Sequence, residues 1–248
     1  MRKIAFRSLL FLIAMTMGNM SKASAQTDAR HSMSKMSKDS QAEVDHSMLA
    51  HHMEMDVHMK MTALRPVKPG DQEKAQQVAR VARKVCERYK DYKTALADGF
   101  HIFMPNIPHK QYHFNNSEYA REAAEHFNPE HPTSLLYEKD GDGYKLIGVM
   151  YTAPAWTSED ELNERVPLSI VQWHAHVNLC LPPPNQSQAA ANSEHRFGPE
   201  GSISKQTECE AVGGRFVPQI FGWMVHVYPF AQNPNDIWSV ERQMSEEN

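Results

Sequence analysis

Trp173-His174-Ala175-His176-Val177-Asn178-Leu179-Cys180 is the stretch around which the rest of the chain is organised. Successive side chains of a β-strand point to opposite faces, so a strand here carries Trp173 and every second residue after it on one, apolar face. His174 and His176 then lie on the other face, with Asn178 and Cys180. Imidazole is the commonest metal-ligating side chain. The stretch therefore predicts a strand that supplies half of a metal site; the alternative is two histidines that hydrogen-bond or face solvent.

Two more segments can be aligned with this strand by the same alternation. In residues 147–152 the bulky side carries Ile147, Val149 and Tyr151, and in residues 221–228 it carries Phe221, Trp223, Val225 and Val227. If helices cover the bulky sides, the opposite face collects the candidate ligands and two small residues. These are His174, His176, His226, Met150 and Met224, with Gly148 and Gly222 leaving room beside them.

Such a set of side chains has the chemistry of a metal centre. Three imidazoles with one or two thioethers suit copper, whereas three imidazoles with a water suit zinc equally well. His113 is the best candidate for a fourth imidazole, and Tyr228 or Asn178 could orient the ligands. The competing interpretation is that Met150 and Met224 fill the core and that the histidines satisfy buried backbone groups.

The N-terminus predicts export. Residues 1–25 combine a basic start, an apolar run from Leu9 to Met17 that is too short to span a bilayer, and an Ala23-Ser24-Ala25 cleavage pattern. We expect a periplasmic or secreted protein cleaved after Ala25, with no later membrane span. Removing these residues moves the formal net charge from −4 to −8, which makes nucleic acid an improbable partner.

Residues 26–70 predict a disordered arm and a Pro-containing linker. Residues 31–61 are rich in Met and His and poor in aliphatic residues, so they cannot bury enough apolar surface to offset the entropy of ordering. Thioether and imidazole together are ligands for copper. The candidate arm ligands are His46, Met48, His51, His52, Met53, Met55, His58, Met59 and Met61. The alternative is a low-complexity linker without a metal role.

The remainder, residues 71–238, predicts one α+β domain followed by a charged tail at 239–248. Periodicity indicates helices near residues 74–97, 117–127 and 204–212, and strands near 112–115, 135–138, 144–152, 170–179 and 215–230. A capping box of Ser158 and Glu161 indicates the start of another short helix. The Asp140-Gly141-Asp142-Gly143 run indicates a hairpin. We expect an antiparallel sheet of four or five strands with helices on one face. Nucleotide-binding and serine-hydrolase motifs are missing from the sequence.

Three cysteines follow the leader: Cys86, Cys180 and Cys209. An exported chain with an odd count favours one disulfide and one free thiol. Cys180 and Cys209 both lie at the edges of predicted elements and flank a Pro-rich excursion, so we expect them to pair. Cys86 falls in the middle of a helix and is expected to behave as a small buried apolar residue.

Two resemblances accompany these patterns. The segments Tyr112-His113-Phe114-Asn115, residues 131–138, residues 146–151 and residues 173–180 resemble an uncharacterised family of exported bacterial proteins, which implies a shared fold and site but no activity. The Met/His-rich arm is similar to the tails of periplasmic copper-handling proteins.

The leading hypothesis from the sequence is an exported copper-binding protein, with zinc as the alternative metal. A second hypothesis is a metalloenzyme with a His174/His176/His226 centre and an open coordination position, with Glu130 or Glu138 as base. A third is a metal-free domain that binds a small ligand or partner through Trp156, Trp173, Trp223 and Tyr228.

Overall fold

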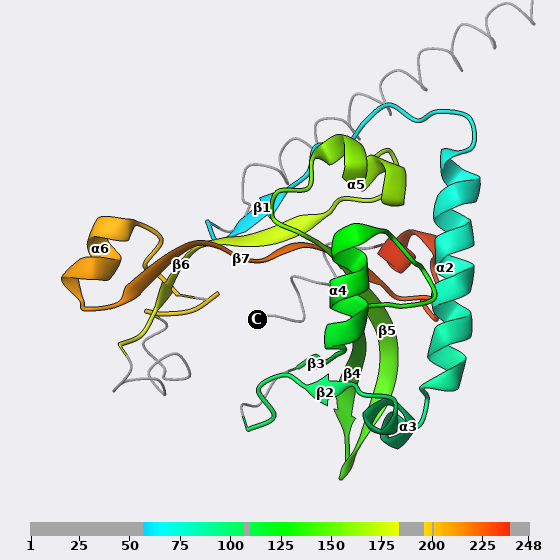
Figure 1. The fold of residues 1–248 in the computed structure, drawn as a ribbon, viewed down its shortest axis with the longest axis horizontal. Helices are drawn as coiled ribbons and strands as arrows, with labels where there is room; N and C mark the ends of the chain where they lie inside the picture. Colours follow the sequence, from blue (N-terminus) through cyan, green and yellow to red (C-terminus); the bar gives the residue numbers. More distant parts are fainter. Residues whose placement is uncertain (1–56, 107–109, 184–195, 200, 239–248) are drawn as a thin grey trace, which may run out of the picture. The chain divides into compact units, whose positions relative to one another are not determined.

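The computed structural model describes residues 57–106, 110–183, 196–199 and 201–238. The predicted leader, most of the arm and the charged tail lie outside these residues. The chain divides into two units, residues 1–55 and Asp56–Asn248, and the fold below is that of the second unit. It is α+β, as predicted: one antiparallel sheet accompanied by helices (Figure 1).

The sheet has seven strands in the order β1-β6-β7-β5-β4-β3-β2, and every neighbouring pair is antiparallel. The strands are β1 (Met59–Met61), β2 (His101–Ile102), β3 (Tyr112–Asn115), β4 (Ser134–Asp140), β5 (Gly143–Ala153), β6 (His174–Leu181) and β7 (Arg215–Val227). The prediction of four or five strands missed the two edge strands. β2 is only two residues long, which is too short for a periodic signal.

β1 corrects the prediction for the end of the arm. Residues 59–61 were expected to be disordered, but they pair with β6 beside the His174–His176 segment. Pairing satisfies the backbone groups of β1, and Met59 is only 7% exposed. The composition of a three-residue segment gives no hint of this, because the partner strand is more than a hundred residues away in the sequence.

The helices are α2 (Asp71–Arg88), α3 (Tyr92–Ala97), α4 (Ser117–Glu125), α5 (Glu159–Arg165) and α6 (Gln206–Ala211), with a 3₁₀ turn η3 (Pro234–Trp238). The long helix predicted over residues 74–97 is two helices, because the Asp91 side chain accepts the N–H of Lys93 and caps a new start. The capping box predicted at Ser158 and Glu161 is present.

One face of the sheet packs against the helices and forms the main core. Its members include Ala82 and Cys86 of α2, Leu162 of α5, Trp173 just before β6, and Val225 of β7, all at most 1% exposed. Burial of a large apolar side chain contributes about 1.5–3 kcal/mol, so this face accounts for most of the stability of the domain. The helices therefore leave the opposite face of the central strands for a different set of side chains.

Two irregularities shift the predicted alternation. At Leu136/Tyr137 the register between β4 and β5 slips, and Ile147 joins the face opposite the helices. In β7, Phe221 and Gly222 both have positive φ, at 63° and 81°. Phe221 was expected on the helix-covered side but is 59% exposed, since this bulge turns it outward.

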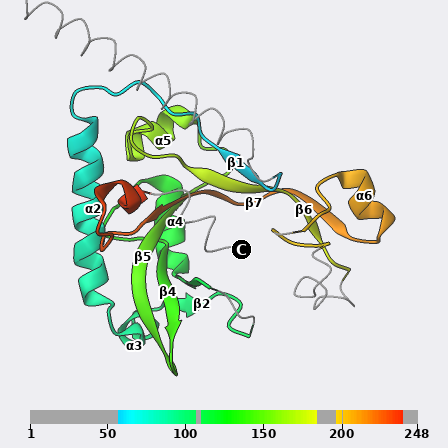
Figure 2. The ribbon, with the colours of Figure 1, turned by 180° about the vertical axis from the view of Figure 1, so that it is seen from behind.

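Beyond the bulge, β6 and β7 continue as a two-stranded ribbon that ends at α6 (Figures 1 and 2). The predicted disulfide joins Cys180 of β6 to Cys209 of α6, with Cα atoms 5.5 Å apart. Phe197 and Ile203 pack against this disulfide.

Cys86 is a free, fully buried thiol, as expected. In the described part of the chain, no helix has the length and apolar character that crossing a membrane requires.

Candidate metal centre

The four histidines singled out from the sequence lie in a row on the face of the sheet opposite the main core. The ring centres of His174 on β6 and His226 on β7 are 5.2 Å apart. His176 lies 5.7 Å from His174, and His113 of β3 lies 5.6 Å from His226. Three strands thus bring together imidazoles from three distant parts of the sequence.

The two central imidazoles are buried and uncharged. His174 is 1% exposed and His226 is 2% exposed. Burial, and then the neighbouring imidazoles of His176 and His113, lower the pKa of His174 to about 3. Burial and the other three imidazoles hold the pKa of His226 well below its ordinary value. A neutral imidazole keeps one nitrogen lone pair, which is the form that binds a metal.

The contacts of His226 indicate which of its nitrogens carries that lone pair. Tyr228 donates its hydroxyl proton to Oε1 of Gln111 at 3.0 Å, and its oxygen lies 3.3 Å from Nδ1 of His226. Because the hydroxyl has one proton, Nδ1 of His226 acts as the donor to Tyr228. Nε2 of His226 is then the bare nitrogen. It is buried and has no hydrogen-bond partner among the described residues.

His174 has a similar orphan atom. Its Nδ1 is buried and finds no hydrogen-bond partner in the described part of the chain. An unsatisfied buried polar atom costs about 1–3 kcal/mol, so two of them on neighbouring rings call for an explanation. The sequence interpretation in which these histidines satisfy buried backbone groups does not account for these two atoms.

The spacing within each neighbouring pair of rings matches that of two imidazoles on one ion. With a metal–nitrogen bond of about 2.0 Å and about 1.2 Å from nitrogen to ring centre, two imidazoles on a tetrahedral metal have centres roughly 5 Å apart. The separations of 5.2, 5.6 and 5.7 Å are close to that value. Within the described residues, however, no three His, Cys, Asp or Glu side chains already surround a common point as ligands do. Binding therefore requires the rings to turn about their side-chain torsions.

The two predicted thioethers lie on the same face. Met224 pairs directly with His174, and Met150 pairs directly with His226. Both methionines are also members of a small apolar cluster with Leu136, Ile147 and Tyr228. Their burial has an ordinary packing explanation, so their position permits ligation without requiring it.

The glycines do not leave space, in contrast to the prediction. A Cβ on Gly148 would lie 2.4 Å from the carbonyl oxygen of Val227, and one on Gly222 would lie 2.3 Å from that of Ala153. Both glycines allow the backbone of a neighbouring segment to approach closely. The centre is therefore packed tightly by the sheet itself.

The predicted aromatic binding set is dispersed. Trp173 and Trp223 belong to the main core, whereas Tyr228 lies in the cluster on the opposite face. Trp156 is 84% exposed. These residues form no common surface, because the alternation that collects the histidines separates the aromatic side chains. Asn178, suggested from the sequence as a residue that orients the ligands, instead donates its Nδ2 hydrogen to the carbonyl oxygen of Val57 at 3.0 Å.

Of the predicted arm ligands, His58, Met59 and Met61 lie within the described residues, and those from His46 to Met55 lie outside them. His58 is 2% exposed, and its two ring nitrogens face the carbonyl oxygens of Val177 and Gly201. These contacts give His58 a structural role in fixing β1.

The carboxylates suggested as catalytic bases occupy other places. Glu138 pairs with Lys145 in the hairpin of β4 and β5, and Glu130 is exposed in a loop. The electrostatic influences on His174 and His226 come from the other imidazoles. The geometry thus supplies ligands but gives no reason to assign a base.

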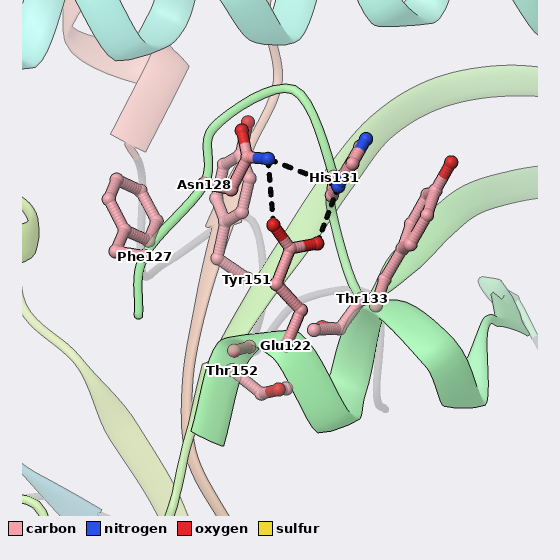
Figure 3. A pocket seen from close by; sticks show the side chains of 9 residues that line it. Glu122, Phe127, Asn128, His131, Thr133, Tyr151 and Thr152 are labelled. Atoms are coloured by element: carbon pink, nitrogen blue, oxygen red, sulfur yellow. Dashed lines mark hydrogen bonds and ion pairs between the residues drawn. The ribbon is translucent and has the colours of Figure 1, made fainter. Parts of the chain in front are cut away.

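A polar network that the sequence did not suggest lines a small surface pocket. The Glu122 carboxylate accepts hydrogen bonds from Asn128 and His131 (Figure 3), which keep the pKa of Glu122 below its ordinary value. His131 stacks on Tyr119 with ring centres 4.2 Å apart. The network joins the end of α4 to the loop before β4. We assign it a structural role.

Comparison of the chain with protein families, with curated proteins and with solved structures finds no match. The resemblances noted from the sequence therefore stay predictions, and the functional argument depends on the site.

Proposed function

We propose that this protein is an exported metal-binding protein whose imidazole cluster holds a copper ion. The observation that carries the proposal is Nε2 of His226, a buried imidazole nitrogen without a hydrogen-bond partner among the described residues. Its ring is oriented from the other side by Tyr228 and Gln111. Metal-binding histidines are typically held in this way, with one nitrogen fixed by a hydrogen bond and the other left for the ion.

Copper is the preferred ion because of the side chains that surround the cluster. Imidazole suits both Cu(II) and Zn(II), whereas thioether sulfur favours Cu(I). Met150 and Met224 lie directly across the strands from His226 and His174. No carboxylate is among the groups that influence the two central rings most strongly. This mixture of soft and neutral ligands favours copper over the hard cations.

The arm has a complementary role in this proposal. Its thioethers and imidazoles would capture ions, and a short tether to the sheet would give them a high effective concentration at the cluster. Export follows from the leader pattern at residues 1–25. N-terminal sequencing of the protein purified from the cell envelope or medium should begin at Gln26.

The decisive experiment separates the cluster from the arm. In an arm-silenced mature protein, every Met is replaced by Leu and every His by Gln at the arm positions before Asp56. These are His31, Met33, Met36, His46, Met48, His51, His52, Met53 and Met55. Competition titration with chromophoric chelators for Cu(I), Cu(II) and Zn(II) should show one site with a dissociation constant below micromolar.

The H174A/H226A double variant should lose that site. His101, an exposed histidine of β2, supplies the matched control, and H101A should bind as the parent does. The proposal is contradicted if none of the three ions binds with a sub-micromolar dissociation constant. It is also contradicted if the site survives in H174A/H226A.

A further inference from the structure

The end of the arm enters the sheet next to the imidazole cluster. In the register of β1 and β6, Met59 pairs with His176 and Met61 pairs with His174. Directly opposed residues in an antiparallel pair share a face, with Cβ atoms about 4.5–5.5 Å apart. Two thioethers that the sequence assigned to a flexible arm are therefore neighbours of two candidate ligands on the sheet.

The residue between them confirms which face they occupy. Lys60 pairs with Ala175, a member of the main core. The Lys60 ammonium lies 5.1 Å from the ring centre of Trp223, which belongs to the same core. Since side chains alternate along a strand, Met59 and Met61 lie on the opposite face, where His174 and His226 are found.

Hydrogen bonds at both ends hold β1 in this register. On one side the N–H of Val177 donates to the carbonyl oxygen of His58 at 2.8 Å, and the amide of Asn178 donates to that of Val57. On the other side the N–H of Thr62 donates to the carbonyl oxygen of Trp173 at 2.8 Å. The N–H of Trp173 in turn donates to the Thr62 hydroxyl oxygen at 3.0 Å. These hydrogen bonds fix the positions of the two methionines.

Met59 differs from the methionines in the apolar cluster. It is 7% exposed, yet it belongs to none of the three apolar clusters that the described residues form. Each of the three histidines on β6 and β7 also pairs with at least one methionine. His176 pairs with Met59, His174 pairs with Met61 and Met224, and His226 pairs with Met150.

We propose that Met59 and Met61 of β1 are thioether ligands of the same centre and make it selective for Cu(I). This inference rests on the proposed function of the imidazole cluster and adds to it the preferred oxidation state and two further ligands. Thioether sulfur stabilises Cu(I) and contributes little to Zn(II), so these methionines separate the two ions more than the imidazoles do. The centre then spans β1, β6 and β7.

The test compares Cu(I) and Zn(II) binding to the arm-silenced full-length mature protein and to its M59L/M61L variant. Leucine keeps the apolar volume and removes the sulfur. We expect the Cu(I) affinity to fall by at least tenfold and the Zn(II) affinity to stay within about twofold. Met104, an exposed methionine distant in sequence from these strands, supplies the matched control, and M104L should leave both affinities unchanged.

X-ray absorption of the Cu(I) complex gives a second readout. The parent should show sulfur as well as nitrogen scattering, and M59L/M61L should show less sulfur. Unchanged Cu(I) affinity in M59L/M61L, or equal losses for Cu(I) and Zn(II), would overturn the role of β1 while leaving the imidazole centre intact. If the parent binds none of Cu(I), Cu(II) and Zn(II), the proposed function itself fails, and so the two failures are distinguishable.

Discussion

The hydroxyl oxygen of Tyr228 lies 3.3 Å from Nδ1 of His226, and its proton is directed to Gln111. This relationship fixes the ring of His226 from the side away from its unpartnered nitrogen. In the proposed centre it would present this buried histidine as an oriented ligand, with the lone pair of Nε2 available.

Replacing Tyr228 by Phe should weaken metal binding without removing any ligand. The phenylalanine ring keeps its place in the apolar cluster, but His226 loses the group that orients it. Loss of such an outer contact typically lowers metal affinity by about 10–100-fold. Chelator competition on the arm-silenced protein measures the change. Tyr137→Phe is the control, because that hydroxyl donates to the carbonyl oxygen of Tyr89 in the main core, and its metal affinity should equal that of the parent.

Replacing His174 by Leu should stabilise the metal-free protein while abolishing metal binding. The substitution removes a buried nitrogen that has no partner among the described residues, and we expect a gain of about 1 kcal/mol in the free energy of unfolding. His58→Leu should instead destabilise the protein, since both ring nitrogens of His58 contact carbonyl oxygens. Urea denaturation in the presence of chelator compares the two variants. A loss of stability in H174L would indicate that His174 is structural.

The metal-free protein should lose stability as the pH falls from about 6.5 to 5. His174 and His226 have lowered pKa values in the folded state, so in this range only the unfolded chain takes up their protons. The loss from His174 should be about 2 kcal/mol at pH 5, His226 should add to it, and both develop above the range in which carboxylates titrate. Urea denaturation at several pH values measures it. The H174L/H226L variant should show a flatter profile, and an equally steep one would assign the effect to other groups.

Cys86 should be unreactive until the protein unfolds. It is fully buried in α2, and burial raises the pKa of its thiol to about 12, so the reactive thiolate is scarce at neutral pH. A chromogenic disulfide reagent should detect no thiol in the native protein and one thiol in denaturant. Prior reduction should raise the number of thiols detected in denaturant to three, since Cys180 and Cys209 form a disulfide. A thiol that reacts in the native state would contradict the packing of α2 described above.

Gly222→Ala should destabilise the protein by about 3 kcal/mol, because it combines a positive φ with overpacking. The φ of Gly222 is +81°, and a Cβ there would lie 2.3 Å from the carbonyl oxygen of Ala153. Gly141→Ala is the matched control: its φ is +54°, but nothing lies within 4 Å of its Cβ position. We expect Gly141→Ala to cost only about 1 kcal/mol. Thermal denaturation of both variants measures the difference.

Local patterns in the sequence predicted most of the elements that the structure contains. Asp140-Gly141-Asp142-Gly143 predicted the hairpin of β4 and β5, and Ser158 with Glu161 predicted the start of α5. The strict alternation around His174 predicted a strand with one apolar face. These features depend on neighbours within a few residues, which is the range over which a sequence can be interpreted by periodicity and capping chemistry.

The features that the sequence missed depend on contacts between distant segments. The bulge at Phe221 and Gly222, the slip at Leu136, and the close approach to Gly148 come from the way strands meet in the sheet. A bulge changes the face of every residue beyond it, so single-strand alternation placed Phe221 and Ile147 wrongly.

The sequence by itself determined that this chain carries an α+β domain with a strand of paired histidines, a Met/His-rich segment, and one disulfide. Only the tertiary structure decided that His174 and His226 are neighbours, that two of their buried nitrogens lack partners among the described residues, and that β1 lies beside them. The physical reason is that backbone pairing between strands sets the register, and register decides which distant side chains meet on one face.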